Sequence, residues 1–388
     1  MKSNMSVLIG TAMALYATLH FYVYEKITMI ESLTQAGQQP IVIFLGLMVV
    51  APLLTSTLIR HNLTGLAVPL AWAGYMWMGF VFLFFAFSIA LDFYRLATDV
   101  GARLIGLNMS RFTLSVTDST LAAAAAALLA TVDGFFSARQ TNIEWVRLRT
   151  PKIRGRASLR IIQISDLHLG LLVSRNRLRQ LVDDIEELQP ELIVSTGDLI
   201  DMQMDHPGAF ADLLRELKPR FGKFAVTGNH EAFAGLDHSL AFTQQAGFTL
   251  LCGAGANVPG IINIVGVDDP AFPHQGHADT PAESELLGRY PEEQFTLLLK
   301  HQPVVEPASL PRFDLQLSGH THGGQIFPFS LLVKLFYPAK TGLSRIGDRA
   351  QLYVNRGAGT WGPPIRFLAS PEITVIELQS DNGSVANQ

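Results

Sequence analysis

Four stretches in the first third of the chain are apolar enough to form helices in a membrane. Ile41–Ile59 and Leu66–Leu91 contain no Asp, Glu, Lys or Arg, and Met5–Tyr24 is similarly apolar. A helix needs about 20 apolar residues to cross the hydrocarbon core, because its backbone groups must be satisfied within the segment. Ser119–Ala138 is rich in Ala but contains Asp133, so its insertion decides the topology. A cleaved signal peptide is the alternative for the first stretch, but further spans follow it.

From about Thr141 onward the pattern changes to short apolar runs that end in Gly or Ser, separated by amphipathic helical patterns. This alternation is typical of a soluble α/β protein. The predicted strands that precede polar motifs are Leu159–Ile164, Leu192–Ser195, Phe224–Val226, Phe295–Leu299 and Leu315–Leu317. We therefore expect two domains, a transmembrane helical region at 1–140 and a soluble domain at 141–388. Within the latter, the apolar stretch Phe327–Tyr337 is interpreted as a core helix, with a lip that touches membrane or an acyl chain as the alternative.

Charge and cysteine content narrow the function. The formal net charge of -4 and the pI of about 6.3 argue against a protein that binds polyanions, so no nucleic-acid partner is expected. Cys252 is the single cysteine, which excludes an intrachain disulfide and a metal site built from cysteines.

The distribution of basic residues indicates a topology. If four helices span, the side with both ends of the helical region collects eight Lys and Arg residues, and the other side four. By the positive-inside rule, this asymmetry favours a cytoplasmic C-terminal domain. We expect a multi-pass protein of the cell inner membrane.

Each predicted strand in the second domain is followed directly by side chains that can bind metal. These are Asp166 and His168, then Asp198, then Asn229 and His230, then His301, and finally His320 and His322. Loops beyond the carboxyl ends of strands line one crevice in α/β sheets, so these side chains can converge. Oxygen and imidazole ligands without thiolate suit Mn, Fe, Zn or Co. They are too many for one tetrahedral ion, and two ions fit.

These motifs resemble those of the calcineurin-like metallophosphoesterases, over nearly all of residues 158–378. The matching motifs are Asp166-x-His168, Gly197-Asp198-x-x-Asp201, Gly228-Asn229-His230-Glu231, His301 and Gly319-His320-x-His322. The resemblance implies an α/β fold, an αββα sandwich of two mixed sheets. The C-terminal motifs Tyr353–Gly359, Pro364–Arg366 and Pro371–Ile373 further resemble the membrane-associated bacterial branch, which includes UDP-2,3-diacylglucosamine hydrolases of lipid A synthesis.

The resemblance also implies roles for individual residues. It assigns Asp166, His168 and His322 to a first metal, Asn229, His301 and His320 to a second, and Asp198 to both; His230 is left for catalysis. Asp201 and Glu231 either orient ligands or belong to turns. Arg356 is expected to bind substrate phosphate, with a surface salt bridge as the alternative.

We therefore expect a membrane-anchored phosphoesterase that uses two divalent ions, with manganese as the first choice. It would hydrolyse phosphodiester or pyrophosphate bonds by attack of a metal-bridging hydroxide. The membrane anchor favours an amphipathic, lipid-linked substrate such as UDP-diacylglucosamine. The alternatives are a phosphodiesterase or phosphomonoesterase of broad specificity on soluble esters, and a non-catalytic membrane sensor that binds metal and phosphate.

Overall fold

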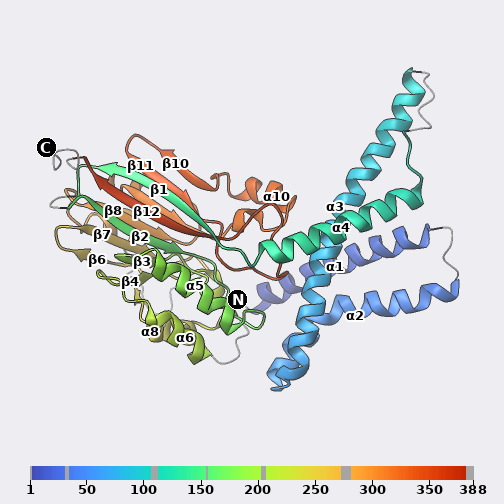
Figure 1. Ribbon diagram of the computed structural model, residues 1–388, viewed down its shortest axis with the longest axis horizontal. Helices are drawn as coiled ribbons and strands as arrows, with labels where there is room; N and C mark the ends of the chain where they lie inside the picture. Colours follow the sequence, from blue (N-terminus) through green and yellow to red (C-terminus); the bar gives the residue numbers. More distant parts are fainter. Residues whose placement is uncertain are drawn as a thin grey trace. The chain divides into compact units, whose positions relative to one another are not determined.

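The computed structural model describes residues 2–30, 35–105, 112–153, 156–201, 207–271 and 281–381 (Figure 1). The chain divides into two compact units. The first consists of Met1–Phe136 together with Gly362–Phe367, and the second of Ser137–Trp361 together with Leu368–Gln388. The short segment Gly362–Phe367 thus belongs to the helical unit, although the sequence alone placed it in the second domain.

The first unit contains long helices. They are α1 (Lys2–Thr28), α2 (Gln35–Arg60), α3 (Thr64–Ile105) and α4 (Val116–Ser137). Among the described residues, the stretches Gly37–Arg60, Thr64–Leu104 and Val116–Ser137 are long and apolar enough to cross a membrane. The expected N-terminal set of apolar helices is therefore confirmed, with three such stretches. Helix α1 contains the remaining predicted span, Met5–Tyr24, but the side chains of residues 1–6, 8 and 9 lie outside the described residues.

Helix α3 is longer than one membrane crossing. Its 42 residues correspond to roughly 63 Å at 1.5 Å per residue, about twice the hydrocarbon thickness. Its apolar part ends near Asp92, whose carboxylate accepts hydrogen bonds from Lys26 Nζ at 2.7 Å and Tyr22 Oη at 3.2 Å. This ion pair joins the C-terminal end of α1 to the point where α3 becomes polar.

The second unit is built on two six-stranded sheets. In spatial order, the first sheet contains β1 (Asn142–Thr150), β12 (Glu372–Ser380), β2 (Ser158–Ile164), β3 (Leu192–Ser195), β4 (Lys223–Ala225) and β5 (Thr249–Leu250). The second contains β10 (Gly342–Ile346), β11 (Ala350–Val354), β9 (Leu315–Ser318), β8 (Phe295–Lys300), β7 (Ile262–Val267) and β6 (Ala254–Val258). Both are mixed, because β12 runs antiparallel to β2, and β6 and β10 run antiparallel to their neighbours. The predicted sandwich of two mixed sheets is confirmed.

Alternation along β2 explains why the sheets stack. Leu159 and Ile161 pack in one core with Leu297 and Leu317 of the second sheet. Residues of the opposite parity point to the other face of the strand, where Ile162 and Ile164 share a second core with side chains of three helices. The helices of this unit are α5 (Arg175–Glu187), α6 (Pro207–Glu216), α7 (Asn229–Ala234), α8 (Leu236–Gln245), α9 (Glu283–Leu287) and α10 (Phe329–Phe336), with 3₁₀ turns η1 (Pro307–Arg312) and η2 (His322–Gly324).

Helix α10 corrects the interpretation of Phe327–Tyr337 as a core helix. None of its residues Phe329–Phe336 is buried. Helical periodicity turns Ser330, Val333 and Tyr337 toward the protein and leaves most of the remaining apolar side chains exposed. Apolar composition alone could not distinguish a buried helix from an amphipathic helix with an exposed apolar face.

Candidate metal centre

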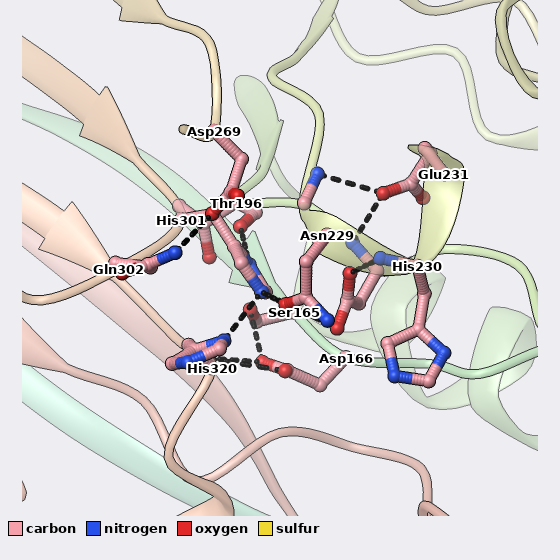
Figure 2. A network of polar contacts seen from close by, with 12 residues as sticks. Ser165, Asp166, Thr196, Asn229, His230, Glu231, Asp269, His301, Gln302 and His320 are labelled. Carbon is pink, nitrogen blue, oxygen red and sulfur yellow. Dashed lines mark hydrogen bonds and ion pairs between the residues drawn. The ribbon is translucent and has the colours of Figure 1, made fainter. Parts of the chain in front are cut away.

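The predicted ligand side chains converge after the carboxyl ends of strands from both sheets, and Figure 2 shows Asp166, Asn229, His301 and His320 among them. Strands β2, β3 and β4 of the first sheet precede Asp166 and His168, Asp198, and Asn229. Strands β8 and β9 of the second sheet precede His301, and His320 and His322. The cluster thus lies where the edges of two stacked sheets meet, and each sheet contributes about half of it.

A first group of donor atoms surrounds Nε2 of His322. This atom lies 3.0 Å from Nε2 of His168 and 3.4 Å from Oδ1 of Asp166. Oδ2 of Asp198 lies 3.7 Å from Nε2 of His168. Donor atoms of Asp166, His168 and His322 all lie within 4.8 Å of one another, which is close enough for one ion to contact all three.

A second group surrounds Nε2 of His301. It lies 3.1 Å from Nδ1 of His320, 3.2 Å from Oδ1 of Asn229 and 3.3 Å from Oδ2 of Asp198. The same Asp198 oxygen therefore faces both groups. The other oxygen, Oδ1, accepts the backbone N–H of His230 at 2.9 Å, which fixes the carboxylate in this orientation.

Hydrogen bonds on the far side of two imidazoles direct their lone pairs into the centre. Nδ1 of His301 donates to the Thr196 carbonyl at 2.7 Å, so Nε2 is the unprotonated nitrogen in the neutral imidazole. The Tyr337 hydroxyl donates to Oε1 of Gln302 at 3.1 Å and so accepts from Nε2 of His320 at 2.9 Å. This network assigns Nδ1 of His320 as unprotonated.

The donor set fits bound cations. With these tautomers, the facing nitrogens of His301 and His320, 3.1 Å apart, present two lone pairs to each other. Such a pair is unfavourable unless a proton or a cation lies between them. Buried carboxylates, an amide oxygen and imidazoles form a set that divalent transition metals accept. The residues present therefore fit two ions that share Asp198.

The pKa shifts agree with this interpretation. Burial lowers the pKa of His168 and of His320, which favours the neutral imidazole that binds metal. Burial also acts on His301, but the adjacent Asp198 carboxylate outweighs it and raises the pKa of His301 to about 10. Asp198 thus stabilises a positive charge at this position, which a bound cation would supply.

The backbone at the centre adopts an uncommon conformation. Asp166, His168, Asp198, His320 and His322 have φ angles of 51°, 46°, 53°, 70° and 50°. Left-handed conformations cost non-glycine residues on the order of 1–3 kcal/mol each and persist where the surroundings fix them. Gly319 allows the β9 loop to approach the β2 loop, because a Cβ there would lie 2.2 Å from Oδ2 of Asp166. The backbone is therefore held in a strained form that aims donor atoms inward.

The His230 ring lies beside, and apart from, the Asn229 side chain (Figure 2). Its Nδ1 lies 3.1 Å from Oδ1 of Asp201, which leaves Nε2 for another partner. Burial acts against it, but the hydrogen bond to Asp201 raises the pKa of His230. The ring makes edge contacts with Phe233 and Trp361, at centroid distances of 5.6 and 6.1 Å. Asp201 thus contacts His230, whereas the sequence led us to expect that it orients a metal ligand or belongs to a turn.

Glu231 joins two of the ligand loops. Its buried carboxylate accepts the backbone N–H groups of Asp198, Leu199 and Gly228 at 3.0, 2.7 and 2.7 Å. Burial and the charge of Asp198 raise the pKa of Glu231 to about 7, against the effect of these donors. Glu231 thus links the β3 loop to the β4 loop through buried hydrogen bonds.

Arg356 lies between two carboxylates. Its Nη2 is 2.5 Å from Oε1 of Glu144, and its Nε is 2.5 Å from Oε2 of the buried Glu372. This is the salt-bridge alternative that the sequence left open, while contact with phosphate stays a prediction.

The sequence did not single out the residues that orient the ligands. Thr196, Gln302 and Tyr337 act through hydrogen bonds to the two imidazoles or to each other. Thr196 and Gln302 adjoin motif residues, which is a usable signal. Tyr337 comes 15 residues after His322 and could be recognised only from the structure.

Comparison with known proteins places the chain in a family. The chain matches the calcineurin-like phosphoesterase family over residues 159–324. It is 33% identical over 239 residues to an uncharacterized metallophosphoesterase of Aquifex aeolicus, a match that covers 61% of this chain and 92% of that protein. An uncharacterized metallophosphoesterase of Helicobacter pylori is 37% identical over 226 residues, 58% of this chain and 60% of that protein.

One vertebrate relative is named as a transmembrane protein. The transmembrane protein with metallophosphoesterase domain of Danio rerio is 35% identical over 234 residues, which cover 57% of this chain and 53% of that protein. The match thus spans nearly all of the Aquifex protein but only about half of this longer relative. Together with the geometry of the centre, these matches show that the chain belongs to the calcineurin-like metallophosphoesterases, a family of metal-dependent phosphoric ester hydrolases.

Proposed function

We propose that this protein is a membrane-anchored phosphoesterase that hydrolyses phosphodiester or pyrophosphate bonds at a centre for two divalent ions. The observation that carries the proposal is the pair of donor groups that share Oδ2 of Asp198. Asp166, His168 and His322 would hold one ion, and Asn229, His301 and His320 the other. Manganese is the first choice, with Fe, Zn or Co as alternatives.

The chemistry divides between the ions and the chain. When bound, two such ions would neutralise phosphate charge and lower the pKa of bound water to a value near neutral pH. His230 would donate a proton or a hydrogen bond to the leaving oxygen through Nε2, while Asp201 holds Nδ1. Asp198 and Glu231 keep the β3 and β4 loops in register, so that His230 stays beside the ligand set.

The surroundings of His230 support a substrate with an apolar or planar part. Trp361 is 53% exposed and Phe233 is 39% exposed, and both rings contact His230. Gln325 holds the Trp361 backbone through two hydrogen bonds of 2.8 Å. Fixed aromatic surface beside a phosphate-binding centre suits an amphipathic ester. A lipid-linked nucleotide ester such as UDP-diacylglucosamine is the substrate we propose first.

We also propose that the protein crosses the cell inner membrane several times and that its active site lies in the cytoplasm. The apolar helices of the first unit support a multi-pass protein of the cell inner membrane. The excess of Lys and Arg on the side of the chain that carries the second unit supports a cytoplasmic active site.

The test is turnover by the full-length protein, purified in detergent and loaded with Mn²⁺. We expect hydrolysis of UDP-diacylglucosamine or another lipid-linked diester, with bis-p-nitrophenyl phosphate as a soluble probe. His230→Ala should lower kcat by roughly 10²–10⁴-fold with metal content unchanged, and Asp198→Ala should lose both ions.

Each contrary result has a meaning. Turnover of soluble esters alone would favour the enzyme of broad specificity. Metal binding without turnover on the whole panel would favour the non-catalytic sensor. Loss of metal in the His230→Ala variant would overturn the role of that residue.

A further inference from the structure

Helix α10 has an apolar outer face. We use this name for Leu331, Leu332, Leu335 and Phe336, whose side chains are 54%, 50%, 76% and 78% exposed. Phe327 and Phe329, at the start of the helix, are also more than 40% exposed. Contiguous apolar side chains of this size on a surface mark a site of interaction rather than chance exposure.

The helix cannot roll to bury this face. Its inner side carries Ser330 and Tyr337, and Tyr337 is hydrogen-bonded to His320 at the metal centre. Gly324, with φ at 84°, brings η2 so close that a Cβ there would lie 2.3 Å from Cα of Ser330. The inner side is therefore fixed against the loop that carries His322, and the outer face stays exposed.

The charges around α10 define the chemistry of its partner. From Leu315 to Gly347 the sequence contains no Asp or Glu. In the same region Lys334, Lys340 and Arg345 are exposed. An apolar face with three exposed cations and no carboxylate in the adjoining sequence suits the surface of an anionic bilayer, because the apolar side chains can enter the acyl boundary and the cations can meet headgroups.

A bilayer is also the partner within reach. The same chain carries three stretches that are apolar enough to span a membrane, so the second unit is tethered to one. We propose that the α10 outer face lies in the headgroup and upper acyl region of an anionic bilayer leaflet. This docking rests on the membrane anchor and not on turnover, so its test does not depend on the proposed reaction.

The test reads the depth of single side chains in the membrane. In a Cys252→Ser background, the full-length variants Leu335→Cys and Phe336→Cys would each carry a nitroxide label. Asp183→Cys on the exposed face of α5 is the matched control. Proteins are reconstituted in phosphatidylcholine vesicles with or without phosphatidylglycerol, and collisions of the label with oxygen and with a water-soluble nickel complex are measured. Metal content confirms that each variant is folded.

We expect the labels on α10 to gain oxygen contact and lose nickel contact when phosphatidylglycerol is present, while the label at residue 183 stays aqueous. Replacing Lys334, Lys340 and Arg345 by Gln should reduce this dependence on the anionic lipid. Labels on α10 that remain as aqueous as the control in both lipids would overturn the proposal. So would labels that lose contact with both oxygen and nickel in vesicles, because a protein surface would then cover the face. If this loss of both contacts disappears when the protein is diluted, the covering surface belongs to a second copy of the chain, which also overturns the proposal.

Discussion

At the scale of single residues, the orientation of His230 depends on Asp201. The Asp201 carboxylate holds Nδ1 of this imidazole at 3.1 Å. We predict that Asp201→Asn lowers kcat by roughly 10–100-fold with metal content unchanged, because a partner that orients an active side chain typically contributes this much. Steady-state kinetics and metal analysis check it. Asp212→Asn, at an exposed position on α6, should retain wild-type kcat. Equal losses in both variants would remove the role of Asp201.

Arg356 is predicted to stabilise the folded chain through its ion pair with Glu372. It neutralises the carboxylate of Glu372, whose side chain is 1% exposed. Arg356→Ala leaves that carboxylate buried with only part of its charge compensated, so the free energy of unfolding should fall by about 2–4 kcal/mol. Arg147 pairs with Glu377, and the Arg147 side chain is 66% exposed. Arg147→Ala should therefore lower the free energy of unfolding by less than about 1 kcal/mol. Denaturant titration of both variants in detergent checks the difference. A stable Arg356→Ala variant with a raised KM would instead support contact with substrate phosphate.

At the scale of elements, α10 also reaches the metal centre through its C-terminal end. Tyr337 fixes the tautomer of His320. Tyr337→Phe should weaken the ion bound by His320 by roughly 10–100-fold and leave the other ion tightly bound. Titration with a competing chelator measures both affinities. The matched change Tyr290→Phe lies outside this network and should alter neither. Two unchanged affinities in Tyr337→Phe would show that Tyr337 does not position His320.

A second element-scale prediction concerns the ends of α6 and α8. Lys223 on β4 donates to the carbonyls of Leu214 and Ala246 at 2.6 and 2.8 Å, near the C-terminal ends of these helices. Burial lowers the pKa of Lys223 to about 8, against 10.5 for an ordinary lysine. Between these values the unfolded chain binds more protons than the folded chain, so stability should rise with pH from about 8 to 10.5.

Unfolding of the wild type and of Lys223→Met across this pH range tests the sign. The variant should lack that part of the rise, whereas Lys218→Met, at an exposed position, should keep it. A Lys223→Met variant that follows the wild-type pH dependence would contradict the assignment.

At the scale of the whole molecule, the side of the membrane on which the second unit lies can be measured with a single thiol. Cys252 is exposed, but partial burial of its thiol and the neighbouring Asp268 raise its pKa to about 12, so the native thiol should react slowly. An exposed Asp183→Cys in a Cys252→Ser background is a better probe. We predict that an impermeant maleimide labels it in inverted membrane vesicles and not in intact spheroplasts. Labelling in spheroplasts would place the active site outside the cytoplasm.

The sequence indicated most of the elements that build the centre. Short apolar runs predicted the strands, and polar residues directly after each run predicted the ligand candidates. For α10 the same reasoning was wrong, because composition alone does not show which side of a helix faces the protein.

Local pattern alone determined that the N-terminal helices are apolar enough for a membrane and that strand ends carry oxygen and nitrogen donors. Both follow from residue type and short-range spacing. Only the tertiary structure decided that the donors come from two stacked sheets, that Asp198 turns one oxygen to both groups, and that Tyr337 reaches His320. These depend on contacts between residues far apart in the chain, whose energies no single segment contains.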